Sequence, residues 1–414
     1  MQSRFLIKRA SRVSLAAVLP RAVKGAGALA LAATLAACVA PLGQTGTGPR
    51  VALPEPVQTP VLGPANGEVI GDGPTRIAML VPLSAPGAAG QVGTGLRNAA
   101  ALAMRDPGTS GLQLVVKDSG GTPEGASTAA AEAISEGAQL IVGPLFSPAV
   151  KAAGGVAGSS GVPVLAFSTD PTVASRNVYL LSFQVGTEVD RVVSFAASQG
   201  RTRIAAMVPE SNYGTLALSA LRAAASRSGA QVVAVERFGA ANASAAASRL
   251  APALAQADLL FIPEGGTGLA GAIAALRSAG ADLSQVKLAG TGVWNGGATL
   301  AQPEVAGGWF AGPDPQGFRL FADRYTASYG AAPARIAPVA YDAVRLAANL
   351  APGYPAQELT NPNGFAGTDG IFRFRPDGNV DRGLAVLEIR NGAAVTLSPA
   401  PTTFQAGSPQ VAVR

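Results

Sequence analysis

The sequence predicts an α/β protein made of two doubly wound, Rossmann-like lobes. Short apolar runs of strand length alternate with longer alanine-rich stretches over most of the chain. Continuous apolar runs joined by helices are typical of parallel strands covered on both faces, so we expect parallel sheets flanked by helices. About 340 residues follow the N-terminal segments, which is enough for two such lobes.

The first 37 residues predict a secretory signal that is not part of the fold. Six cations between Arg4 and Lys24 precede a short apolar stretch, and Leu35-Ala36-Ala37-Cys38 then resembles the lipobox of bacterial lipoproteins. The resemblance implies that Cys38 is acylated and becomes the first residue of the mature protein. Residues 38–75 are rich in Pro, Gly and Thr, which predicts a disordered tether.

Removal of the signal changes the charge balance of the chain. The whole chain has 31 Lys and Arg against 25 Asp and Glu, but six of the cations precede Cys38, which leaves 25 of each sign. We therefore exclude a nucleic-acid partner, which requires a clustered basic face. The chain has no histidine and no second cysteine, so we expect no catalytic residues, no metal site and no cofactor.

From Arg76 onward the predicted elements follow one another as strand, then helix. Strands are expected at 77–81, 112–116, a run ending at 143, 162–167, 203–208, 231–236 and 258–262. Helices are expected at 91–105, 124–136, 318–329 and 336–350. We expect the turn Pro376-Asp377-Gly378 to join strands 371–375 and 384–390 in a hairpin, and residues 393–414 to form a tail.

Five segments, in register over residues 76–392, together resemble the type I periplasmic binding proteins, in particular the leucine/isoleucine/valine-binding group. The segments are VGPLFSPAV (142–150), VPVLAFSTD (162–170), VPESNYG (208–214), the helical pair within 321–348, and GFAGTDGIFRFRPDGN (364–379). The resemblance implies two lobes joined by a hinge of three crossovers, with the ligand bound in the cleft and not chemically converted. It implies an N-lobe of about 76–183 and 313–350, and a C-lobe of about 184–312 and 366–392.

Two hydroxyl-rich loops of the N-lobe follow neighbouring strands. In parallel sheets, ligands bind beyond the carboxyl ends of the strands. By resemblance, Ser147, Ser168 and Thr169 stand where the amino-acid binders hold the ligand's carboxylate. Ser147 and Asp170 equally suit the starts of helices, because Pro148 and Pro171 follow them.

The C-lobe offers three further candidates, Tyr213, Glu264 and Trp294. The amino-acid binders place a tyrosine and a glutamate in two loops of this lobe, and this sequence lacks that pair. Glu264 is a candidate acceptor for an ammonium group, and Trp294 is a candidate wall of the cleft. Both could equally be ordinary loop and packing residues.

Two functions remain open at this point. The first is a lipid-anchored, periplasm-facing component that delivers an amino-acid-like ligand to an ABC permease. The second is a penicillin-binding protein activator, whose partner is a peptidoglycan synthase. Val39 favours export of the lipoprotein to the outer membrane, where an activator would act.

Overall fold

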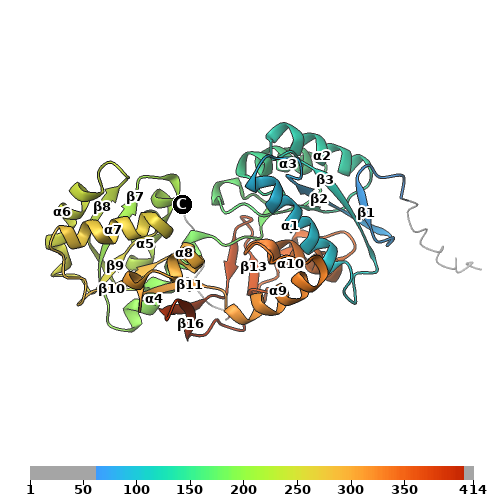
Figure 1. The fold of residues 1–414 in the computed structure, drawn as a ribbon. Helices are drawn as coiled ribbons and strands as arrows, with labels where there is room; N and C mark the ends of the chain where they lie inside the picture. Colours follow the sequence, from blue (N-terminus) through green and yellow to red (C-terminus); the bar gives the residue numbers. More distant parts are fainter. Residues whose placement is uncertain (1–61, 405–414) are drawn as a thin grey trace, which may run out of the picture. The chain divides into compact units, whose positions relative to one another are not determined.

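The structure is a computed structural model that describes residues 62–404, all of which lie in one compact unit. The predicted signal, Cys38 and most of the predicted tether lie outside the described residues. The described part contains two large sheets and one small sheet, with helices on both faces of the large ones (Figure 1). This confirms the predicted fold class.

The first lobe is built on a six-stranded sheet. Its strands are, in spatial order, β1 (Glu68–Ile70), β3 (Leu112–Asp118), β2 (Thr75–Val81), β4 (Ile141–Val142), β5 (Val164–Ala166) and β6 (Val178–Leu180). All neighbours pair in parallel except β1, which is antiparallel to β3. Its helices are α1 (Ala88–Ala103), α2 (Pro123–Ser135), α3 (Ser147–Ser159), α9 (Pro315–Tyr329), α10 (Ala337–Leu350) and α11 (Ala356–Leu359).

Alternate side chains of β2 enter the two cores of this lobe. Ile77, Met79 and Val81 pack with α1 and α10 on one face. Ala78 and Leu80 pack with α2 and α3 on the other. Every residue of β2 is buried, as expected for a central parallel strand, and this explains why its sequence is a continuous apolar run.

The second lobe is built on a seven-stranded sheet. Its strands are, in spatial order, β16 (Ala393–Ser398), β15 (Ala385–Arg390), β11 (Trp309–Gly312), β10 (Lys287–Gly290), β9 (Leu259–Phe261), β7 (Arg203–Pro209) and β8 (Gln231–Phe238). The core on one face contains α4 (Val185–Ser198) and α5 (Asn212–Arg227), and the core on the other contains α6 (Ala243–Leu254) and α7 (Gly266–Ser278). Short helices follow β9 and β10 along the chain: η2 (Gly292–Asn295), α8 (Gly297–Leu300) and η3 (Pro303–Val305).

The chain passes between the two large sheets three times, as the fold prediction required. The crossovers follow β6, β11 and the small sheet formed by β12 (Phe365–Gly367), β13 (Gly370–Phe374) and β14 (Val380–Arg382). This small sheet belongs to the first lobe, because Phe372, Phe374 and Val380 lie in the core with α1 and α10. The Leu180 backbone N–H of β6 also donates to the Gly378 carbonyl at 2.8 Å.

Three of the predicted boundaries differ from the structure. Strand β1 lies inside the expected tether and β16 inside the expected tail, so the folded body is longer at both ends. The predicted hairpin pairing is wrong: β13 pairs with β14, whereas β15 crosses to the second lobe and pairs with β11 and β16. Residues 366–382 therefore pack with the first lobe, where we had expected the C-lobe to resume at 366.

Candidate functional site

The first-lobe loops bring the predicted hydroxyl groups together. Ser147 begins α3 after β4, and Ser168 follows the neighbouring strand β5. Their Oγ atoms are 2.9 Å apart, and the Asp170 backbone N–H donates to Ser168 Oγ at 3.2 Å. Ser168 is buried, Ser147 half-buried and Thr169 exposed. The expectation that the carboxyl ends of these strands place the loops side by side is confirmed, while their role in binding remains a prediction.

Two carboxylates lie among these loops. Burial by itself raises the pKa of Asp170, but hydrogen bonds from Thr172 and Ser147 outweigh it and lower that pKa. Asp118 ends β3, and there too hydrogen bonds outweigh burial and lower the pKa, with Ser84 and the Gly120 N–H among the donors. Both groups are therefore held ionised at the polar end of the first sheet. Asp170 also caps the 3-10 helix η1 (Pro171–Val173), as its alternative interpretation predicted.

The second lobe places Tyr213 against Thr291. Tyr213 lies in the first turn of α5, after β7, and Thr291 follows β10. The two hydroxyl oxygens are 2.7 Å apart, and Thr291 is fully buried. Burial, together with the charges of Glu188 and Glu264, raises the pKa of Tyr213. This tyrosine is therefore a neutral hydrogen-bonding group close to two carboxyl groups.

Sequence reasoning missed Glu188, the most deeply buried of the acidic residues near this site. It lies in the first turn of α4, and its side chain is 8% exposed. The Gly292 backbone N–H donates to Glu188 Oε2 at 2.9 Å. Burial raises the pKa of Glu188 from 4.5 to about 7, and the Gly292 hydrogen bond only partly offsets this. A signal was present in the sequence, because Glu188 stands on the apolar face of α4 that Val185, Val189 and Val192 define.

Glu188 also lines a cavity of about 300 Å³. Phe183, from the first crossover, and Arg335, which precedes α10, lie on the same cavity. Its other lining residues come from two loops: Gly292, Val293, Asn295 and Gly296 after β10, and Gly312 and Pro313 at the second crossover. The cavity thus combines one buried carboxyl group, one guanidinium group and one aromatic ring.

The shifted pKa of Glu188 predicts how stability depends on pH. The native state keeps this proton between pH 4.5 and 7, whereas the unfolded state releases it, so this contribution is present at low pH and is lost as the pH rises through 7. We expect Glu188→Gln to gain stability relative to the wild type by about 3 kcal/mol between pH 5 and pH 8. Urea denaturation of the ligand-free protein at both pH values measures this. Glu210→Gln, an exposed change in the same lobe, should show no such gain.

Glu264 and Trp294 lie in different environments. Glu264 follows β9, is half-buried, and accepts a hydrogen bond from the Gly265 N–H at 3.0 Å. Trp294 is fully buried, and its indole N–H lies 3.1 Å from the Ile262 carbonyl and 2.9 Å from the Glu264 carbonyl. The prediction that Trp294 forms a wall of the cleft is wrong, because the side chain has no exposed surface and packs inside the second lobe.

Buried charges gather where the chain crosses between the lobes. Arg335 donates two hydrogen bonds of 2.8 Å to Asp369, whose side chain is 1% exposed. Arg382 Nε donates to the Ser182 carbonyl at 2.7 Å, and its two terminal nitrogens have no hydrogen-bond partner. The Arg382 guanidinium lies over the Phe183 ring, 4.2 Å from its centroid. Burial lowers the pKa of Arg382, and the neighbouring Asp369 opposes this.

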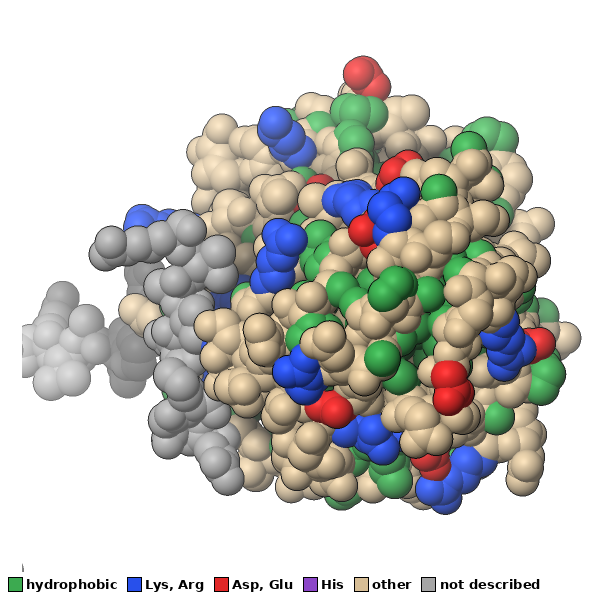
Figure 2. All heavy atoms as spheres, turned by 90° about the vertical axis from the view of Figure 1, so that its left-hand side faces the viewer, with side chains coloured by type: hydrophobic (Ala, Val, Ile, Leu, Met, Phe, Trp, Pro, Cys, Tyr) green, Lys and Arg blue, Asp and Glu red, His purple; other side chains and the backbone are tan. Residues whose placement is uncertain are grey.

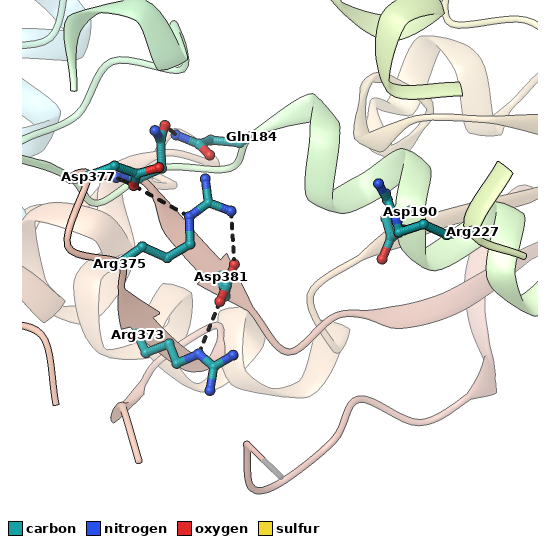
Figure 3. A network of polar contacts seen from close by, with 8 residues as sticks. Gln184, Asp190, Arg227, Arg373, Arg375, Asp377 and Asp381 are labelled. Atoms are coloured by element: carbon teal, nitrogen blue, oxygen red, sulfur yellow. Dashed lines mark hydrogen bonds and ion pairs between the residues drawn. The ribbon is translucent and has the colours of Figure 1, made fainter. Parts of the chain in front are cut away.

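A second, partly exposed set of ion pairs borders the same crossovers. Figure 3 shows Arg375 between Asp377 and Asp381, each 3.4 Å away, and Arg373 close to Asp381 at 3.0 Å. These pairs lie on the small sheet and on its Pro376-Asp377-Gly378 turn. Asn379, in the same turn, accepts a hydrogen bond of 2.9 Å from Gln184 Nε2 in the first crossover.

The described residues contain neither a metal-ligand cluster nor a membrane-spanning helix. Within 62–404, no three or more acidic, cysteine or histidine side chains come together in a way that could hold a metal ion. No helix in the same range has the length and apolar character needed to span a bilayer. On the face drawn in Figure 2, basic and acidic side chains are interspersed among apolar ones, and neither sign forms a broad area.

Comparisons with known proteins agree with this fold. A family model described as "periplasmic binding protein" matches residues 74–393. None of the curated protein sequences compared with the chain gives a significant match.

Three solved structures have a fold similar to that of this chain, and each is 20% or 21% identical to it in sequence. A protein from Rhodospirillum rubrum described as a branched-chain amino acid ABC transporter is 21% identical, with a TM-score of 0.69 over 78% of this chain and 99% of that one. A leucine-binding protein from Thermotoga maritima is 20% identical, with a TM-score of 0.57 over 79% and 98%. A branched-chain amino acid transporter substrate-binding protein from Streptococcus pneumoniae, in complex with isoleucine, is 21% identical, with a TM-score of 0.54 over 78% and 99%.

Proposed function

Because the chain belongs to the periplasmic binding protein family, we propose that it is the non-enzymatic, solute-binding component of an ABC-type uptake system. The proposed ligand is a small polar molecule, such as an amino acid, held between the polar ends of the two large sheets. The observation that carries the proposal is the convergence of hydrogen-bonding side chains at those ends: Ser147 with Ser168 in one lobe, and Tyr213 with Thr291 and Glu188 in the other.

The proposal includes a location and a partner. The family implies a location outside the cytoplasm, and the lipobox-like Leu35-Ala36-Ala37-Cys38 supports a lipid anchor on the mature protein. Acyl chains added at Cys38 would hold the folded body close to a membrane. Its partner would be an ABC permease that accepts the ligand.

The activator of a penicillin-binding protein is the weaker alternative. Its support is Val39, which favours the outer membrane and lies outside the described residues. The three solved structures cited above are described as a branched-chain amino acid ABC transporter, a leucine-binding protein and a transporter substrate-binding protein, which supports uptake over activation of a peptidoglycan synthase.

A thermal-shift experiment tests the proposal directly. The purified protein, kept in mild detergent, is heated with each of the twenty amino acids. A ligand present at 100 times its Kd should stabilise the native state by about 2.7 kcal/mol, because it binds the native state alone.

Variants then link that effect to the first-lobe loops. Ser147→Ala and Thr169→Ala should reduce the shift produced by an amino acid that binds the wild type. Ser159→Ala, an exposed change at the other end of α3, should leave it intact. A flat response to the whole panel would contradict the proposed function, and equal shifts in all three variants would remove these loops from the site.

A further inference from the structure

The cavity beside α4 has spare capacity to accept hydrogen bonds. Glu188 lines this cavity and is more than nine-tenths buried. Its Oε2 atom accepts from Gly292, while its Oε1 atom accepts no hydrogen bond from any described residue. No described residue donates to this carboxyl oxygen, and Glu188 faces the cavity, so the oxygen is free to accept a hydrogen bond from a bound molecule. A ligand group placed beside Glu188 in this cavity should therefore be a hydrogen-bond donor.

The Arg335 guanidinium group lines the same cavity, but its ion pair is with Asp369 and not with Glu188. Arg335 is committed to Asp369 through two hydrogen bonds of 2.8 Å, which form a bidentate pair. A ligand carboxylate would have to compete with that pair for Arg335. A ligand ammonium group meets no competing cation at Glu188, because the Gly292 backbone N–H is the one group of the described residues that donates to this carboxyl group.

The first-lobe loops also present acceptors. Asp170 is held ionised and can only accept, and Ser147 is among the groups that lower its pKa. The Ser147 and Ser168 oxygens are 2.9 Å apart, so one of these hydroxyl groups donates to the other and spends its hydrogen atom within the pair. An ionised carboxylate beside a partly used hydroxyl pair is a poor setting for a second carboxylate. Asp118 adds another ionised group at the same end of the sheet.

We propose that the group recognised on the ligand is a cationic amine, which pairs with Glu188, and that the ligand needs no carboxylate to bind. This inference rests on the proposed function, because it concerns the ligand of the same polar site. It names Glu188 as the acceptor, where the sequence had pointed to Glu264. Organic amines that have no carboxylate are therefore expected to bind to this site.

Binding to Glu188 would be linked to a proton. The raised pKa of Glu188 means that the empty site holds a proton at pH 6, and an arriving ammonium group expels it. The other titratable or charged groups that face this region are Tyr213 on α5, Glu264 after β9 and Arg335 before α10. Tyr213 stays protonated because its pKa is raised, and Arg335 stays charged. On α4 itself, Asp190 is paired with Arg227 at the surface (Figure 3).

Matched sets of three compounds test the proposal by calorimetry. Each set has an amino acid, the amine that lacks its carboxylate and the acid that lacks its amine: leucine, 3-methylbutylamine and 4-methylpentanoate; phenylalanine, phenethylamine and 3-phenylpropanoate; alanine, ethylamine and propanoate. For at least one set we expect the amine to bind within about tenfold of the amino acid, and the acid to bind at least 100-fold more weakly. Between pH 7 and pH 6 the affinity for the amine should fall about fivefold, with release of about half a proton at pH 7 and nearly one at pH 6.

Two variants identify the acceptor. Glu188→Gln keeps an oxygen for the Gly292 N–H and removes the charge, so we expect affinity for the amine to fall at least about 30-fold and its pH dependence to disappear. Glu210→Gln, exposed and in the same lobe, should bind as the wild type does. The assignment to Glu188 would be overturned if Glu264→Gln lost affinity for the amine while Glu188→Gln kept it.

The outcomes separate this inference from the proposed function. If amino acids or acids bind and no amine does at millimolar concentration, the cationic-ligand inference is overturned while the solute-binding proposal stands. If none of the nine compounds binds, the inference is overturned, and the panel of twenty amino acids decides the proposed function separately.

Discussion

Replacing Trp294 with alanine should lower the free energy of unfolding by about 4 kcal/mol. The side chain is fully buried in the second lobe. It lies against Gly290 and Gly308, where a Cβ atom would collide with the indole ring. The substitution leaves a cavity that this closely fitted backbone cannot readily fill. It also removes the donor that the Ile262 and Glu264 carbonyls share. Urea denaturation of both proteins measures the loss.

A second substitution separates packing from hydrogen bonding at this position. Trp294→Phe keeps much of the apolar volume and loses the N–H, so it should cost about half as much as alanine. A different result would follow if Trp294 lined the ligand site as the sequence suggested. Alanine would then weaken ligand binding strongly and reduce stability by less than 1 kcal/mol.

Replacing Asp369 with alanine should destabilise the protein by about 4 kcal/mol. Its side chain is almost completely buried, and both carboxylate oxygens accept hydrogen bonds from Arg335. Its charge also offsets that of the buried Arg382, whose terminal nitrogens have no hydrogen-bond partner. Removal of one member of a buried charged group leaves the others uncompensated, which typically costs 3–5 kcal/mol.

The exposed ion pairs of the same region supply the control. Asp377 pairs with Arg375 on the surface of the Pro376-Asp377-Gly378 turn. Asp377→Ala should cost about 1 kcal/mol or less, since solvent screens the ion pair and the substitution otherwise removes the hydrogen bond that Asp377 Oδ1 accepts from the Asn379 N–H. Equal losses for the two variants would mean that the buried network at the crossovers contributes no more than a surface pair.

Central strands of both lobes, such as β2, β7 and β9, could be predicted from sequence because a parallel strand buried on both faces is a continuous apolar run. The short strands β6, β10 and β11 were not predicted. The proximity of Ser147 and Ser168 could be predicted for a related reason: the carboxyl ends of neighbouring parallel strands meet at one edge of the sheet. Both inferences use local pattern and general topology alone.

Other features depend on contacts between residues far apart in the sequence. The turn after Arg375 correctly indicated a reversal, but no local signal shows that β13 pairs with β14 or that β15 pairs with β11 in the other lobe. Trp294 was misassigned because a tryptophan in a glycine-rich loop reads equally as a surface or a core residue. Glu188 was missed because one carboxyl group on an apolar helix face becomes informative only once the β10 loop is seen to cover it.

The path of β15 and β16 determines when the second lobe can be completed. Until the last strands have joined, β11 is an edge strand with unpaired backbone groups, because its outer neighbour β15 begins at Ala385. Between β11 and β15 the chain passes into the first lobe, where it forms α9, α10 and the small sheet, and then returns to the second lobe. Neither half of the polypeptide can therefore mature as an independent folding unit. A newly made chain should therefore complete its two lobes only after nearly its whole length has been synthesised.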